Sequence, residues 1–156
     1  MLQRASRAIN AVAERVLLVF GAAICIILFA QVVFRYAGAS LGWSEEVSRY
    51  LLVAITFLGG TVAYKRASFI GLRGFGHHLG AGVQRAIVVA LQGVTLTCFG
   101  IIAWFGIGYT VKAAEQTSAA LQISMAIPFS AIPLASLIFI VHVLADLART
   151  VARKSA

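Results

Sequence analysis

Two carboxylates and one guanidinium occur within a single helical turn of sequence, at the start of a long apolar segment. Glu45 and Glu46 precede Arg49 by four and three residues, the spacing at which an acid and a base meet on one helix face. Trp43 stands just before them, and its amphipathic ring favours a membrane–water interface. Because charge beside lipid is costly, the motif predicts either an ion pair that stabilises the start of a membrane helix or a contact site for another protein.

A second pair of ionisable residues, His142 and Asp146, lies four residues apart near the end of the last apolar segment. Ionisable groups inside a membrane segment can carry protons. Asp146, however, is within one turn of Arg149 and near the end of the apolar run, where headgroups and water solvate charge. We therefore expect a structural pair at the membrane surface rather than a proton relay.

The remaining reactive side chains do not form a catalytic or metal-binding pattern. Cys25 and Cys98 fall in the middle of apolar segments, where a thiol behaves as a small hydrophobe. His77 and His78 are adjacent, so they cannot share one helix face, and no cysteine–histidine spacing typical of zinc is present. The sequence predicts no enzyme, no metal site and no cofactor.

The composition places the chain in a lipid bilayer. Of its 156 residues, 61% are hydrophobic and 12% are charged, whereas a soluble domain has about 25% charged residues. The net charge is +8, but the basic residues are scattered between apolar runs, which argues against a nucleic-acid partner and for a topology signal. The fold class expected is an all-α membrane protein that forms one domain over residues 1–156.

Four apolar segments meet the requirement of about 20 residues for a membrane-spanning helix. They cover roughly residues 16–34, 47–64, 86–111 and 127–145.

The first fifteen residues have the pattern of an amphipathic helix. Leu2, Ala5, Ile9 and Val12 recur at steps of three and four, which predicts an interfacial helix over residues 1–15 that runs into the first span. A cleaved signal peptide is the alternative, but the apolar run exceeds the 7–15 residues of such a segment. We favour a retained anchor.

The basic residues predict the orientation. Ten of the thirteen lie at the amino end, in the second connection and at the carboxyl end, which leaves Arg35, Arg49 and Lys112 on the other side. The positive-inside rule then predicts cytoplasmic N- and C-termini. The motif around Glu45 and Glu46, and the mildly apolar connection between Ala113 and Ala126, would face the periplasm of a Gram-negative cell. The expected location is the bacterial inner membrane.

Small residues repeat along one face of the third segment, a pattern that lets helix backbones approach closely in lipid. The face could pack against another part of this chain or against a partner. Buried polar groups are few in the apolar segments, which favours a scaffold over a transport path. The face consists of Ala86, Ala90, Gly93, Thr97 and Gly100.

Two stretches of the chain resemble the small membrane subunit of tripartite ATP-independent periplasmic (TRAP) transporters, the DctQ-like family. The more specific stretch reads Val32-Val33-Phe34-Arg35-Tyr36, Trp43-Ser44-Glu45-Glu46, Arg49-Tyr50 and Phe57-Leu58-Gly59. A weaker match runs from Ala120-Leu121-Gln122-Ile123-Ser124 to Ile132-Pro133. The chain departs from the family after Lys65-Arg66, where it lacks the usual histidine and acid, so the role of residues 67–80 is open.

The resemblance implies a non-catalytic subunit of a secondary, sodium-coupled transporter for organic acids. Its partners would be a large membrane subunit, which carries the substrate and sodium sites, and a soluble periplasmic substrate-binding protein. On this interpretation the chain scaffolds the large subunit and helps form the docking surface. The residues expected to order that surface, or simply to stabilise the chain, are Arg35, Trp43, Glu45, Glu46 and Arg49.

Two other functions remain as alternatives. An autonomous four-helix homodimeric transporter should carry an acid near the middle of a span, whereas Glu14 and Asp146 lie at span ends. A membrane assembly protein unrelated to transport differs from the first hypothesis in the identity of its partner.

Overall fold

The computed structural model describes residues 2–74 and 81–152, and this part of the chain is almost entirely helical. Within it the elements form no β-strand, only an isolated bridge between Thr117 and Ser124. The helices are α1 (Leu2–Tyr36), α2 (Gly42–Gly74), α3 (Ala81–Ala113), the short α4 (Ala126–Phe129) and α5 (Ala131–Ala152).

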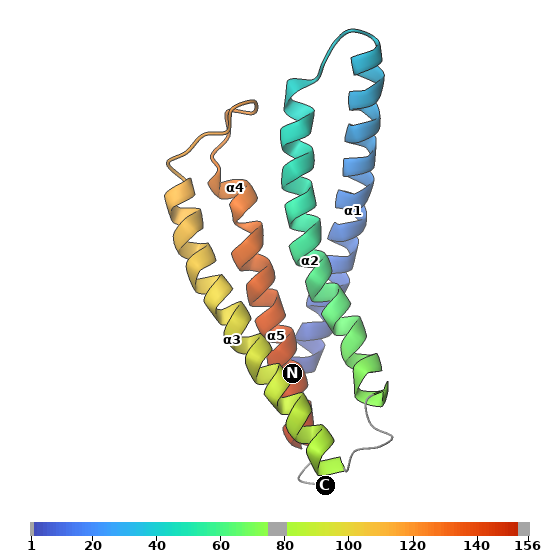
Figure 1. The fold of residues 1–156 in the computed structure, drawn as a ribbon, viewed down its shortest axis with the longest axis vertical. Helices are drawn as coiled ribbons and strands as arrows, with labels where there is room; N and C mark the ends of the chain where they lie inside the picture. Colours follow the sequence, from blue (N-terminus) through green and yellow to red (C-terminus); the bar gives the residue numbers. More distant parts are fainter. Residues whose placement is uncertain (1, 75–80, 153–156) are drawn as a thin grey trace.

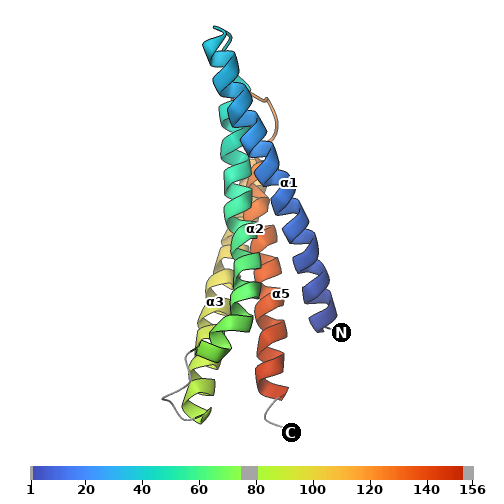
Figure 2. The same ribbon diagram turned by 90° about the vertical axis from the view of Figure 1, so that its right-hand side faces the viewer.

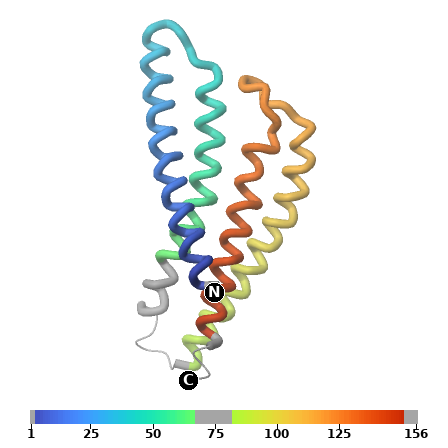
Figure 3. Tube along the Cα trace, turned by 180° about the vertical axis from the view of Figure 1, so that it is seen from behind, coloured from blue at the N-terminus to red at the C-terminus, as the bar shows by residue number. Residues whose placement is uncertain are grey.

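The long helices are arranged as two antiparallel hairpins (Figure 1). One hairpin pairs α1 with α2 and the other pairs α3 with α5, while α5 also packs against α2 and α1. α1 begins and α5 ends at one end of the bundle, which we call the terminal end; the connections 37–41 and 114–125 lie at the opposite, loop end. The hairpins meet towards the terminal end and diverge towards the loop end (Figures 1 and 3).

The prediction of four membrane-spanning segments is confirmed at the level of length and composition. The described residues contain four helices that are long and apolar enough to cross a bilayer. Both prolines of the chain, Pro128 and Pro133, lie in α4 and the first turn of α5. Since a proline interrupts a helix everywhere except in its first turn, the other three helices run without such a break. The spans are Gln3–Tyr36, Gly42–Arg66, Gly82–Ala113 and Ala126–Thr150.

α1 is one continuous helix of 35 residues, so the amphipathic stretch 1–15 forms its first turns rather than a separate element. At 1.5 Å per residue it is about 52 Å long, against a hydrocarbon core of about 30 Å, and it runs obliquely across the bundle (Figure 2). Among residues 3–15, Ser6 and Ala13 are buried, whereas Val12 is 60% exposed. The placement of these turns among lipid headgroups stays a prediction.

One connection is shorter than the sequence indicated. The spans expected over residues 47–64 and 86–111 left 65–85 as the loop between them, but α2 continues to Gly74 and α3 begins at Ala81. That expectation is wrong for 65–74 and 81–85, because glycines lower helix propensity by only about 1 kcal/mol each and this stretch has no proline to stop the helix. His77 and His78 lie outside the described residues.

The interior is built from small side chains, and the large apolar ones face outwards. Most of the buried apolar residues are alanines, such as Ala54, Ala103 and Ala135, which allow close helix approach in lipid. Phe139 of α5 is the largest of these buried residues; its ring stacks on Phe99 of α3 with centroids 3.8 Å apart. The same ring lies 4.8 Å from the ring of Tyr64 in α2. Phe139 therefore joins three helices.

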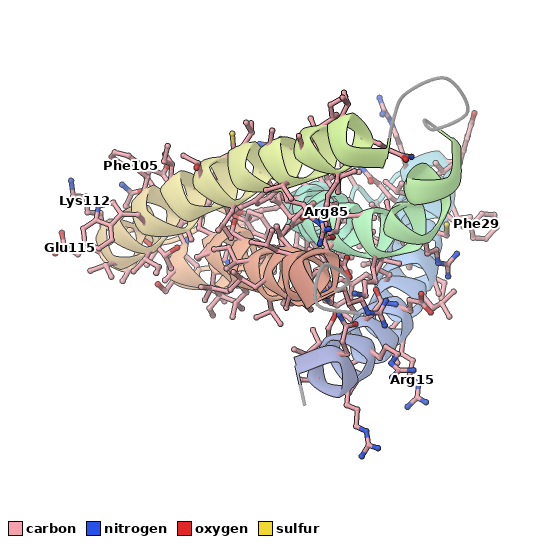
Figure 4. All side chains as sticks on the ribbon, turned by 90° about the horizontal axis from the view of Figure 1, so that it is seen from below. Arg15, Phe29, Arg85, Phe105, Lys112 and Glu115 are labelled. Carbon is pink, nitrogen blue, oxygen red and sulfur yellow. The ribbon has the colours of Figure 1, made fainter. Side chains whose placement is uncertain are left out.

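Replacing Phe139 with Ala should destabilise the isolated chain in detergent by about 3 kcal/mol, because it removes the ring and leaves a cavity between three helices. Thermal unfolding followed by circular dichroism measures the loss. Phe105→Ala is the matched control, since Phe105 is 71% exposed and points away from the bundle (Figure 4). Equal effects of the two substitutions would contradict the packing described here.

Candidate functional site

The two carboxylates of the predicted motif have different surroundings at the loop end. Glu45 pairs with Arg49 at 3.8 Å, and the two side chains are 75% and 72% exposed. An exposed pair of this kind contributes roughly 0–1 kcal/mol. The sequence-based interpretation grouped both acids around Arg49, but in the structure Glu46 makes other contacts.

Glu46 accepts hydrogen bonds from the connection that joins α3 to α4. Its Oε2 accepts the backbone N–H of Ala120 at 3.0 Å and that of Leu121 at 3.3 Å. Its Oε1 accepts the hydroxyl of Tyr50, whose oxygen also lies 3.2 Å from the sulfur of Met125. One carboxylate at the start of α2 thus holds a segment that is 74 residues further along the chain.

The connection 114–125 has a defined backbone of its own. The N–H of Ser118 donates to the carbonyl of Ile123 at 2.9 Å, and the N–H of Met125 donates to that of Gln116 at 2.9 Å. Gln122 has a φ of 55°, which is the left-handed region that a turn requires and a non-glycine residue seldom adopts. These contacts form a small hairpin whose tip is residues 119–122, the segment that Glu46 binds.

The other residues of the predicted motif lie at the same end. Arg35 is exposed on the last turn of α1, where a cation interacts favourably with the helix dipole. Trp43 is 43% exposed in the first turn of α2, as an interfacial ring would be. Their contribution to binding a partner stays a prediction.

The small-residue face of α3 is left largely open by the described residues 2–74 and 81–152. Ala86, Ala90, Gly93 and Thr97 are exposed and Gly100 is partly exposed, and a Cβ added at either glycine meets no atom within 4 Å. α3 packs against α5 through a different face, on which Phe99, Ala103 and Gly106 lie. We predicted that this face packs either against another part of this chain or against a partner. In the described residues the first of these contacts is not observed.

A polar cluster lies buried near the terminal end. Lys65 of α2 and Asp146 of α5 form an ion pair at 3.1 Å, with side chains 4% and 10% exposed. Ser6 of α1 and His142 of α5, both fully buried, are joined by a hydrogen bond of 2.8 Å between Oγ and Nδ1. We call these four residues the terminal cluster.

Further polar contacts surround the terminal cluster. Glu14 of α1 pairs with Arg66 of α2 at 3.1 Å, and Gln3 of α1 donates to the carbonyl of Ala145. Arg85 of α3, which lies close to α5 in Figure 4, donates to the carbonyl of Thr150. Each of these contacts joins two different long helices.

The sequence-based interpretation of Asp146 is corrected by this geometry. We expected a surface acid near Arg149, solvated by headgroups, and an interior poor in polar groups. Instead Asp146 is buried and paired with Lys65, a residue 81 positions away. One feature of the sequence could have indicated this pair. Lys65 and Asp146 carry opposite charges near the ends of two apolar segments, and the distribution of basic residues puts both ends on the same side of the membrane.

Two atoms of the terminal cluster, Nε2 of His142 and Oδ2 of Asp146, have no hydrogen-bond partner among the described residues. Buried atoms of this kind are positions where ordered water is expected. The described ranges contain no group of three or more His, Cys, Asp and Glu side chains that could hold a metal ion.

Comparison with known proteins gives two findings. Residues 24–153 match the family described as "Tripartite ATP-independent periplasmic transporters, DctQ component". The chain is also 29% identical over 135 residues to the isethionate TRAP transporter permease protein DctMQ of Oleidesulfovibrio alaskensis. That alignment covers 81% of this chain and 21% of the relative, so the chain spans about a fifth of the curated relative's length.

The ion pair of the terminal cluster should show strong coupling in a double-mutant cycle. Lys65→Met alone leaves the Asp146 carboxylate buried without its cation, and Asp146→Leu alone removes the counter-charge of Lys65, so each should destabilise the chain by about 3–5 kcal/mol. The double variant should lie within about 1 kcal/mol of the unmodified protein, because neither charge then remains.

Unfolding in detergent by heat or denaturant measures these values. The control is the same cycle with Arg49→Met and Glu45→Leu, the exposed pair, for which a coupling of roughly 0–1 kcal/mol is expected. Additive effects of Lys65→Met and Asp146→Leu would show that the two residues do not interact.

Proposed function

The chain belongs to the DctQ component family of TRAP transporters, and we propose that within such a transporter it is a non-catalytic scaffold for the large membrane subunit. The family match over residues 24–153 carries this proposal. We propose further that the transporter is a sodium-coupled secondary transporter of organic acids in the bacterial inner membrane, with the sodium and substrate sites on the large subunit.

The comparison with the O. alaskensis protein supports a large-subunit partner. Its name joins DctM and DctQ in one permease, and this chain corresponds to 21% of it. On our proposal the partner of this chain is a large membrane subunit of the transporter. Isethionate is named for the relative; for this chain we propose an organic anion, without naming the compound.

The internal polar groups support a scaffold rather than a transport path. In the terminal cluster, Lys65 and Asp146 neutralise one another and Ser6 binds His142. These side chains are used to hold α1, α2 and α5 together. The same geometry disfavours the autonomous homodimeric transporter, because the buried carboxylate that such a protein would use is already paired with a lysine.

The exposed face of α3 supports a partner within the membrane. Small residues bring helix backbones close together in lipid, and here Gly93 and Gly100 have open space around them. We propose that the large subunit packs on the small-residue face, with lipid covering other exposed apolar side chains such as Leu18 and Phe29.

The charge distribution supports the proposed orientation. Arg4, Arg7, Arg15 and Arg66 are exposed at the end where α1 begins, and Figure 4 shows Arg15 pointing outwards there. By the positive-inside rule we propose that the terminal end is cytoplasmic and the loop end periplasmic. The surface around Glu46 and the connection 114–125 would then contribute to docking of a periplasmic substrate-binding protein.

Affinity purification of the tagged chain in a mild detergent, followed by mass spectrometry, tests the proposed subunit role. We expect a stoichiometric large polytopic membrane protein to accompany it, because no helix in the described part of the chain covers the small-residue face of α3. A chain that purifies alone as a stable homodimer would contradict the proposal and favour the autonomous transporter.

Gly93→Leu should weaken the complex without destabilising the isolated chain. A side chain at position 93 meets no atom within 4 Å in this structure, but it would separate closely packed helices at an interface with the large subunit. Co-purification yield measures assembly, and thermal unfolding of the isolated chain measures folding. Gly93→Ala is the graded control and should have a smaller effect. Full assembly with leucine at this position would show that the large subunit packs elsewhere.

A further inference from the structure

The two hairpins diverge at the loop end, yet a contact between them remains there (Figure 3). It is made by Glu46 and Tyr50 of α2 with the connection 114–125, through Ala120, Leu121 and Met125. The terminal cluster holds the hairpins together at the opposite end. Glu46 is therefore the charged residue that fixes the connection relative to α2.

The hydrogen bonds of this contact are stronger than those of a turn held by neutral groups. A carboxylate that accepts two consecutive backbone N–H groups makes charge-assisted hydrogen bonds, which are about twice as strong as neutral ones. At the tip, Ala119, Ala120 and Gln122 are exposed. The other hydrogen bonds there are local: the N–H of Leu121 also donates to Oγ of Ser118 at 3.2 Å, and Nε2 of Gln122 donates to the carbonyl of Ala119 at 3.2 Å. Without Glu46, residues 119–122 are held by the bonds of their own small hairpin.

The surface that results has the organisation of a protein–protein interface. From Gln116 to Met125 the connection contains no charged residue, and several of its side chains are exposed. Charged residues surround it: Lys112 and Glu115 lie at this end of α3 (Figure 4), and the exposed Glu45–Arg49 pair lies on α2. An uncharged centre inside a charged rim is typical of the contact area between two proteins.

We infer that Glu46 is a positioning residue for docking: it holds residues 114–125 in one conformation, and the tip of that connection is the surface to which the substrate-binding protein binds. The inference rests on the proposed function, in which the loop end faces the periplasm and a binding protein docks there. It adds the residue that fixes the surface and a different role for each of the two neighbouring glutamates.

Hydrogen–deuterium exchange of the complete transporter tests the structural half of the inference. In Glu46→Ala, amides of residues 114–125 should exchange roughly ten-fold faster, because a hydrogen bond to a charged acceptor is lost. Peptides of α3 and α5 should be unchanged, which shows that the chain still folds. Glu45→Ala is the matched control and should leave the exchange of 114–125 unchanged. Unchanged exchange in Glu46→Ala would overturn the inference.

Docking is measured by titrating the transporter in nanodiscs with its purified, fluorescently labelled periplasmic binding protein. Glu46→Ala should raise the apparent Kd roughly ten-fold, and Glu46→Gln, which keeps one acceptor oxygen, should raise it less. Ala119→Arg, at the exposed tip, should also raise the Kd by placing a bulky charge in the contact. Glu45→Ala should leave it unchanged.

The variants separate the inference from the proposed function. If Ala119→Arg weakens docking but Glu46→Ala does not, the connection is the docking surface and the positioning role of Glu46 is overturned. If neither affects the Kd while the complex is intact, the docking part of the proposed function fails, and the inference fails with it. Weakened docking in Glu46→Ala with a lowered melting temperature of the whole complex would indicate a general folding role and overturn the inference.

Discussion

A charge buried between helices needs its counter-charge, and this requirement organises the bundle. Helices in lipid are not driven together by the hydrophobic effect, so packing and polar contacts decide how they associate. Here the pair between Lys65 and Asp146 joins α2 to α5, and the bond between Ser6 and His142 joins α1 to α5. Separating the hairpins would leave both charges in a medium of low dielectric constant. The terminal end is consequently the closed end of the structure.

The loop end is held in a different way. The hairpins diverge there, and the carboxylate of Glu46 reaches across to the backbone of Ala120 and Leu121. The two ends thus differ physically: one is fixed by buried side-chain pairs, the other by a carboxylate bound to backbone N–H groups of an exposed connection. Buried pairs that join helices suit assembly of the fold, and on our proposal the exposed connection at the loop end contacts a soluble partner.

The outer surface agrees with a subunit whose main contacts are with other components. Large apolar side chains such as Phe29, Trp104 and Phe105 are exposed, while the interior is rich in alanine. The buried side chains of the terminal cluster join α2 to α5 and α1 to α5. A bundle with these properties provides extended surfaces for lipid and for a membrane partner, as expected for the DctQ component of a TRAP transporter.

The sequence by itself determined the class of the protein, its four apolar helices and its family, because composition, apolar run length and short motifs are local properties of the chain. It also placed the motif of Glu45 and Glu46 at the start of the second helix. It did not show that Glu45 pairs with Arg49 while Glu46 binds Ala120, that Asp146 is buried against Lys65, or that the small-residue face of α3 is left open. Those facts depend on which helix faces which, and the two cross-chain pairs join residues 74 and 81 positions apart. Helical periodicity specifies a face within one helix; only the tertiary structure decided what each face meets.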